Sequence, residues 1–135
     1  MIRVLIVDDD PDILDVVRME LQENPDWKIE TAQSAADAIR QSTATCFDVI
    51  ISDYVMPRMN GAQLLSAFRE KGCTAFIIIY SGRMDEEQEL MMRTLGANAI
   101  LQRRGDPDVE FSALKKYIRT IESGKREQEP KNTGI

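Results

Sequence analysis

The chain has 135 residues, and its 23 acidic and 17 basic side chains give a net charge of −6 at pH 7. It contains no histidine, which excludes a reaction that needs an imidazole base or a histidine metal ligand from this chain. The acidity argues against a nucleic-acid-binding surface, because such surfaces normally carry a basic patch. Hydrophobic residues make up 43% of the chain, and together with the length they predict one globular domain.

The cysteines and the apolar segments indicate a soluble protein. Cys46 and Cys73 do not form a C-x-x-C pair, so we expect reduced and chemically inert thiols. The longest apolar run, residues 75–80, is far too short to span a membrane. The apolar stretch after Met1 is also too short for a signal peptide. We therefore expect a cytoplasmic protein with no membrane contact.

The first third of the chain alternates between strand and helix patterns. The β-rich run 4–7 stops at Asp8, and Asp10-Pro11 then forms an N-cap followed by proline at the first helical position. Apolar residues with helical spacing continue to residue 21. The alternating run 27–31 predicts a half-exposed strand, and Ser34 is a candidate cap for a short second helix.

Three further strand–helix pairs complete the pattern. The apolar runs, which we expect to be strands, cover residues 47–51, 75–80 and 97–101. The helical patterns that follow them cover residues 61–71, 85–95 and 107–121. The polar composition from Gly124 onward predicts a disordered tail or linker over residues 124–135, after a domain of residues 1–123.

Five strand–helix units in a row predict an α/β fold. Continuous apolar runs are typical of strands that are buried on both faces, so we expect a parallel sheet with helices on both sides. The two weaker strands, around residues 27–31 and 97–101, suit the edges of the sheet. We therefore predict a doubly wound, flavodoxin-like sheet of five parallel strands in the order 2-1-3-4-5.

Acidic residues follow the first and third predicted strands. Function in a doubly wound sheet gathers at the carboxyl ends of the strands, where Asp8, Asp9 and Asp53 would converge. Carboxylates this close repel one another, and a hard divalent cation, Mg²⁺ or Mn²⁺, relieves the repulsion. Because Mg²⁺ keeps water ligands and favours phosphate oxygens, we expect a phosphorylated group to complete the site.

The fourth and fifth strands end at residues that suit the same phosphorylated group. They are Ser81 after the fourth strand and the pair Arg103-Arg104 after the fifth. A phosphoryl group on Asp53 would meet the metal ion, the Ser81 hydroxyl and a guanidinium group, for which we expect Arg103 rather than Arg104. No histidine is needed in this chain, because the phosphoryl donor can supply it.

Four sequence stretches in this order carry a family resemblance. They read V-L-I-V-D-D-D-P at 4–11, D-V-I-I-S-D-Y-V-M-P-R-M-N-G at 48–61, I-I-I-Y-S-G at 77–82 and G-A-N-A-I-L at 96–101. Together, over about residues 2–122, they resemble the receiver domain of two-component response regulators, the CheY-like superfamily. The resemblance implies that Asp53 is the phosphoacceptor and Ser81 the switch residue. It also implies that Asp9 binds Mg²⁺ directly, Asp8 acts largely through water, and the Val55 backbone carbonyl is a further ligand.

The chain departs from the family at two positions. Where the family has a lysine followed by proline after the fifth strand, this chain has Arg103-Arg104. Arginine keeps the charge but is longer and planar, and we expect the bond between the two arginines to be trans. At the family's aromatic switch position the chain has Ile100, so we expect coupling to Ser81 to be weak or differently built. Tyr80 and Tyr54 lie nearby but do not occupy that position.

The resemblance implies a phosphorylation-switched signalling domain, not a metabolic enzyme. A sensor histidine kinase or phosphotransfer protein would donate the phosphoryl group to Asp53, and the domain would catalyse its own phosphorylation and dephosphorylation. The added charge would draw Ser81 inward and shift the surface of residues 84–122. That surface, formed by the fourth helix, fifth strand and fifth helix, is also the expected homodimer face.

Two alternatives remain open from the sequence. A pseudo-receiver that binds partners without phosphate control is suggested by Arg103-Arg104 and Ile100. A flavin mononucleotide carrier of the same fold would need a phosphate-binding loop after the first strand, where this chain has three aspartates. No output domain follows residue 123, so we expect either a stand-alone receiver or part of a larger regulator or hybrid kinase.

Overall fold

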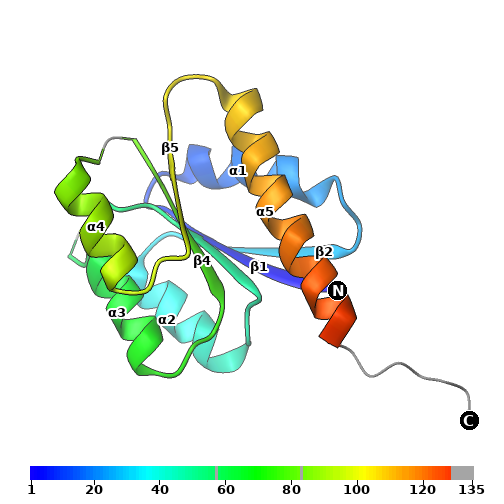
Figure 1. Ribbon diagram of the computed structural model, residues 1–135, viewed down its shortest axis with the longest axis horizontal. Helices are drawn as coiled ribbons and strands as arrows, with labels where there is room; N and C mark the ends of the chain where they lie inside the picture. The colour runs from blue at the N-terminus through cyan, green and yellow to red at the C-terminus, as the bar shows by residue number, and fades with distance from the viewer. Residues whose placement is uncertain (57, 83, 129–135) are drawn as a thin grey trace, which may run out of the picture.

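Five parallel strands form one sheet that is covered by helices on both faces (Figure 1). The structure, a computed structural model, describes residues 1–56, 58–82 and 84–128. The strands are β1 (Ile2–Val7), β2 (Trp27–Ala32), β3 (Val49–Ser52), β4 (Phe76–Ser81) and β5 (Ala99–Gln102). They lie in the order β2-β1-β3-β4-β5, and every neighbouring pair is parallel. The predicted fold class and strand order are confirmed.

The helices divide between the two faces of the sheet, as Figure 1 shows. The helices α1 (Pro11–Gln22) and α5 (Pro107–Gln128) cover one face, and α2 (Ala35–Ala44), α3 (Gly61–Glu70) and α4 (Glu86–Thr94) cover the other. Among the described residues, no helix combines the length and apolar character that crossing a membrane requires.

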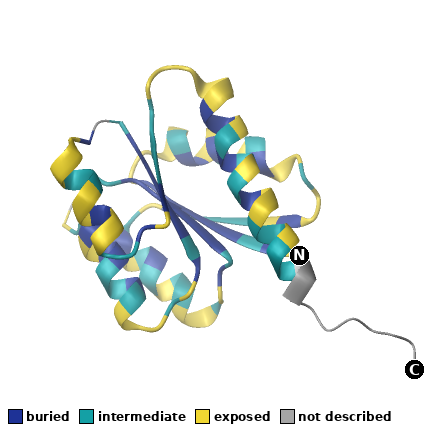
Figure 2. Cartoon of the chain, viewed as in Figure 1, coloured by how far each residue is buried: buried dark blue, intermediate teal, exposed yellow. Residues whose placement is uncertain are grey.

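The central strands are buried on both faces because each face has its own apolar core. Leu5 and Val7 of β1 pack with α2, α3 and α4, whereas Val4 and Ile6 pack with α1 and α5. All four residues of β3 are buried, and Figure 2 shows the central strands in dark blue. The edge strands β2 and β5 carry half-exposed residues, as their weaker sequence patterns predicted.

Four helices begin at a side chain that accepts a hydrogen bond from a backbone N–H of the first turn. These N-cap residues are Asp10, Ser34, Asn60 and Asp85. A cap of this kind stabilises a helix by about 1 kcal/mol. The caps of α1, α3 and α4 fix where the chain turns after β1, β3 and β4, and these three turns carry the candidate site.

The last helix is longer than the sequence indicated. It continues through Gly124 and Lys125 to Gln128. The Lys125 ammonium donates to the Met1 carbonyl at 2.8 Å and pairs with the Asp48 carboxylate at 3.2 Å, which holds this part of α5 against the sheet. Residues 124–128 are therefore helical rather than the disordered tail that their composition suggested. Residues 129–135 lie outside the described residues, and the boundary at residue 123 stays a prediction.

The start of α3 packs so closely against the end of β3 that only glycine fits there. The Gly61 N–H donates to the Tyr54 carbonyl at 2.7 Å, and a Cβ on Gly61 would lie 2.6 Å from the Asp53 carbonyl oxygen. We expect Gly61→Ala to lower the free energy of unfolding by about 1–3 kcal/mol, because the first turn of α3 must move away. Urea denaturation measures this loss.

Gly124→Ala is the matched control for that substitution. A Cβ on Gly124 meets nothing within 4 Å, and the residue lies in the helical part of α5. Alanine is the better helix former, so we expect a gain of about 0.5–1 kcal/mol. Equal effects of the two alanines would show that the contact with Asp53 does not determine the cost.

Candidate functional site

The carboxylates of Asp8, Asp9 and Asp53 come together where β1 and β3 end. Val7 and Ser52 are register partners on these neighbouring strands, and the Asp53 N–H donates to the Val7 carbonyl at 3.0 Å. One oxygen from each carboxylate lies within 4.8 Å of the other two. Asp8 and Asp53 are buried and Asp9 is exposed, so the cluster opens to solvent on the Asp9 side. The strand order therefore brings these side chains together as the sequence predicted.

Asp8 is a buried carboxylate with a perturbed charge. Burial raises the pKa of its carboxyl to about 6; the Asp10 N–H opposes the shift, the charge of Asp53 adds to it, and Arg103 opposes it. Its Oδ1 accepts from the Asp10 N–H at 2.9 Å and its Oδ2 from Arg103 Nη1 at 3.3 Å. Ionised Asp8 is thus destabilised in the absence of further positive charge.

Asp53 uses one carboxylate oxygen inside the protein. Its Oδ1 accepts from the Ser81 hydroxyl at 2.7 Å and from the Tyr54 N–H at 2.8 Å, and Arg103 Nη2 lies 3.6 Å away. The other oxygen, Oδ2, accepts no hydrogen bond from the part of the chain that the structure describes. The side chain is therefore oriented through Oδ1, and Oδ2 is left for a group from outside.

Ser81 already faces the acidic cluster. It is the last residue of β4 and is 2% exposed, with its hydroxyl on Asp53. The sequence led us to expect that a phosphoryl group would draw this side chain inward. In this structure the hydroxyl points toward the acidic cluster, and its movement on phosphorylation stays a prediction.

Arg103 is the arginine that turns toward the carboxylates, while Arg104 is exposed. Its guanidinium pairs with Asp8 and Asp53, and the guanidinium carbon lies 5.2 Å from the centre of the Tyr80 ring. Its backbone N–H donates to the Ser81 carbonyl at 2.7 Å, next to the β4–β5 pairing. No peptide bond within the described residues is cis, as we expected for the bond after Arg103.

Two residues that the resemblance singled out stand apart from these contacts. Val55 follows Asp53 by two positions, and its side chain is 65% exposed. The role of its carbonyl as a metal ligand stays a prediction. Ile100 is half-buried in β5 and packs, like Tyr54, against the core beneath α2, α3 and α4. It carries no polar group toward Ser81.

The sequence analysis missed a buried pair beside Arg103. The Tyr80 hydroxyl donates to Glu110 Oε1 at 2.7 Å, and both side chains are buried. A signal was present, because Glu110 is spaced four and eight residues before Leu114 and Ile118, which are buried on the same helix. An acidic residue in such an apolar stripe needs hydrogen-bond partners, and the stripe alone does not name them.

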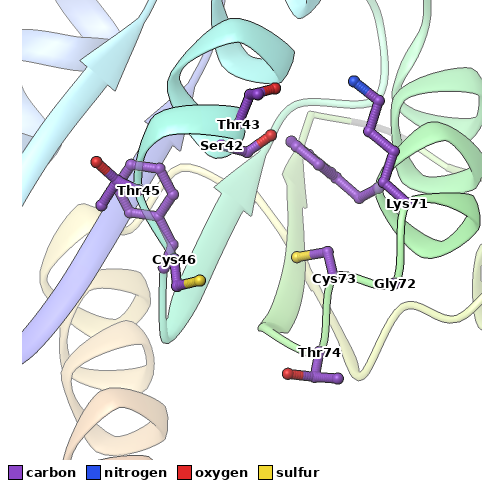
Figure 3. A pocket seen from close by; sticks show the side chains of 10 residues that line it. Ser42, Thr43, Thr45, Cys46, Lys71, Gly72, Cys73 and Thr74 are labelled. Carbon is purple, nitrogen blue, oxygen red and sulfur yellow. The ribbon is translucent and has the colours of Figure 1, made fainter.

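A cavity of about 420 Å³ lies at the amino-terminal ends of β3 and β4, between the segments that precede these two strands. Residues 42–47 and 68–74 contribute to its lining, and Figure 3 shows Cys46 and Cys73 on different sides of it. Cys46 is exposed and Cys73 is half-buried. Asp8, Asp9 and Asp53 are not among the described residues that line this cavity.

Residues 4–115 match the family model of the response regulator receiver domain. The chain is 32% identical over 114 residues to the nitrate/nitrite response regulator protein NarP of Escherichia coli, covering 84% of this chain and 53% of NarP. It is 29% identical over 119 residues to the transcriptional regulatory protein KdpE of Mycobacterium tuberculosis, covering 88% of this chain and 52% of KdpE. The chain thus spans about half the length of these relatives.

Solved structures agree with the sequence relatives. The chemotaxis protein CheY4 of Vibrio cholerae superposes with a TM-score of 0.78 at 29% identity, covering 86% of this chain and 98% of that chain. The response regulator TrrA of Thermotoga maritima, in complex with Mg²⁺ and BeF, gives 0.76 at 26% identity, covering 90% and 99%. With the receiver family matched over most of its length and its acidic residues gathered at the carboxyl edge of the sheet, the chain belongs to the receiver domains of two-component response regulators.

Proposed function

We propose that this receiver domain is switched by a phosphoryl group that Asp53 accepts from a histidine kinase or a phosphotransfer protein. The proposal rests on a difference between the two oxygens of the Asp53 carboxylate. Two donors hold Oδ1, while Oδ2 accepts no hydrogen bond from the described residues, and one oxygen of the same carboxylate belongs to the acidic cluster. A nucleophile for phosphoryl transfer needs this combination of fixed orientation and an available lone pair.

The acidic cluster suits a magnesium ion. Asp8, Asp9 and Asp53 would hold it, with the Val55 carbonyl as a further ligand. Three carboxylates without nitrogen or sulfur ligands fit a hard cation, and the same donor set would accept Mn²⁺. When bound, the cation neutralises negative charge on the carboxylates and on the phosphoryl oxygens.

Groups of this chain carry out the other parts of the phosphoryl transfer. Asp53 Oδ2 attacks phosphorus as the bond to the partner's histidine nitrogen breaks, and the imidazole leaves with the partner. The Ser81 hydroxyl and the Tyr54 N–H keep Oδ1 in place during this displacement. Arg103, 3.6 Å from Oδ1, stands where its guanidinium can meet a phosphoryl oxygen. Water attacking the same phosphorus would later restore the carboxylate.

The net charge and the exposed apolar side chains indicate the kind of partner that this domain binds. The net charge of −6 supports a protein partner rather than direct nucleic-acid binding, and we place the domain in the cytoplasm. A homodimer through α4, β5 and α5 is supported by the exposed side chains of Leu90 and Met91 on α4 and Val109 on α5.

The two alternatives from the sequence gain no support. A phosphate-independent pseudo-receiver rests on Arg103-Arg104 and Ile100, yet the Arg103 guanidinium contacts both buried aspartates. A flavin carrier would need a loop of phosphate-binding N–H and hydroxyl groups after β1. In this chain the Asp10 N–H, which lies in that loop region, already donates a hydrogen bond to the Asp8 carboxylate.

The first prediction concerns covalent phosphorylation. Incubation with acetyl phosphate and Mg²⁺ is expected to add about 80 Da, the mass of one phosphoryl group, in intact-protein mass spectrometry. Asp53→Asn removes the nucleophile and should stay unmodified. Asp12→Asn is the matched control, because Asp12 is an exposed residue of α1 outside the acidic cluster. Modification of Asp53→Asn, or no modification of the wild-type protein, would contradict the proposal.

The second prediction concerns the charge of Asp8. Its folded-state pKa of about 6 lies above the ordinary value of 3.8, so the folded protein binds more protons between these values. Stability from this group is therefore present at low pH and is lost as the pH rises toward 6 and above. We expect Asp8→Asn to raise the unfolding free energy of the metal-free protein by about 1–3 kcal/mol at pH 7 and little at pH 4.

Thermal unfolding with added Mg²⁺ tests whether Asp8 takes part in metal binding. The ion should raise the melting temperature of the wild-type protein and of Asp12→Asn, because a ligand of the folded state stabilises it. The increase should be largely lost in Asp8→Asn. An equal increase in all three proteins would place the metal away from this cluster.

A further inference from the structure

Arg103 lies against a buried tyrosine–glutamate pair that phosphate binding by itself does not require. Tyr80, 5% exposed, is the penultimate residue of β4, and Glu110, 6% exposed, lies in the first turn of α5. The Tyr80 hydroxyl donates to Glu110 Oε1 at 2.7 Å, and the Arg104 N–H donates to Oε2 at 3.0 Å. Both oxygens of the buried carboxylate are therefore used, one on a side chain and one on the loop after β5.

The Tyr80 ring is a further contact of the Arg103 guanidinium, in addition to the aspartates. The guanidinium carbon is 5.2 Å from the ring centre, within the range of a cation–π contact of about 6 Å. The same group donates to Asp8 at 3.3 Å and lies 3.6 Å from Asp53. The ring is therefore one of three groups that orient the guanidinium.

Glu110 strengthens this arrangement through Tyr80. Burial raises the pKa of the Tyr80 hydroxyl well above its usual value, and the hydrogen bond to Glu110 raises it further. The phenol thus stays protonated and donates to Glu110. A phenol that donates to a carboxylate gains electron density in its ring, and an electron-rich ring attracts a cation more strongly.

The backbone of the loop after β5 is held at both arginines. The family's lysine is followed by proline, whereas here Arg104 follows Arg103. Two backbone hydrogen bonds hold the loop instead: the Arg103 N–H on the Ser81 carbonyl and the Arg104 N–H on Glu110. A leucine at position 110 would fit the apolar face of α5 but could accept neither hydrogen bond.

We propose that Tyr80 and Glu110 are positioning residues that aim Arg103 at the phosphoryl site of Asp53. Tyr80 sets the position of the guanidinium, and Glu110 sets both the Tyr80 ring and the backbone of the loop. The proposal rests on the proposed function of Asp53 and adds to it a reason why an arginine serves in this loop. It also ties the first turn of α5 directly to the contents of the site.

A double-mutant cycle tests whether the pair acts through Arg103. The rate of phosphorylation by acetyl phosphate is measured for Tyr80→Leu and Glu110→Gln, each in the wild-type protein and in an Arg103→Ala background. We expect Tyr80→Leu to lower the rate about fivefold, as for loss of one partly desolvated cation–π contact, and Glu110→Gln to lower it about twofold. Neither should lower it further once Arg103 is alanine. Equal losses in both backgrounds would reduce the pair to a structural role.

Two controls separate the ring from general packing. Tyr80→Phe keeps the ring and should recover most of the rate that Tyr80→Leu loses. Tyr117→Leu removes a ring from the same face of the sheet, where Tyr117 lies tilted against Phe76, at the other end of β4 from Tyr80, with ring centres 5.7 Å apart. It should leave the rate unchanged. A loss in Tyr117→Leu as large as in Tyr80→Leu would overturn the specific role of Tyr80.

An NMR measurement tests the geometry without any phosphoryl transfer. The Nε–H proton of Arg103, assigned by its loss in Arg103→Ala, should be shifted by the ring current of Tyr80. The shift should persist in Tyr80→Phe and disappear in Tyr80→Leu. An unshifted proton in the wild-type protein would overturn the positioning role. A protein with the shifted proton that takes up no phosphoryl group would instead refute the proposed function of Asp53.

Discussion

The mutual repulsion of three carboxylates at one edge of the sheet is the constraint on which the rest of the site depends. Asp8, Asp9 and Asp53 lie close together and two of them are buried, and burial together with the charge of Asp53 raises the pKa of Asp8. The guanidinium of Arg103 offsets part of this repulsion. The Asp10 N–H and the Ser81 hydroxyl also donate hydrogen bonds to the carboxylates of Asp8 and Asp53. What remains uncompensated is negative charge on the solvent-facing side, which is where a divalent cation and a phosphoryl group would enter.

The fold holds the three carboxylates together at one edge of the sheet. Parallel pairing of β1 with β3 and of β3 with β4 places the ends of three strands next to one another, so their last residues share one site. The close approach of α3 at Gly61 holds the backbone of Asp53 from behind. Apolar cores on both faces keep the strands rigid, and a rigid edge can hold charged groups at fixed distances despite their repulsion.

The site is linked to the helical layer by polar contacts rather than by an aromatic side chain on β5. Ile100 stands at the family's aromatic position and packs into the core. On the other face, Arg103, Tyr80 and Glu110 form a continuous line of contacts from the aspartates to the first turn of α5. A change at Asp53 that moves Arg103 therefore acts on groups that touch α5 directly. This gives α5 a physical connection to the site that does not run through Ile100.

The sequence by itself determined the fold class, the strand order and the convergence of Asp8, Asp9 and Asp53. Each of these follows from local pattern, since apolar runs, caps and strand ends can be recognised without knowing what they contact. Only the tertiary structure decided that Arg103 rather than Arg104 faces the site and that Ser81 points inward. It also decided that Glu110 is buried and that α5 continues past Gly124, where Lys125 meets Asp48. These outcomes depend on pairs of charged or polar groups far apart in the chain, and burial sets their energies only once the strands and helices have packed.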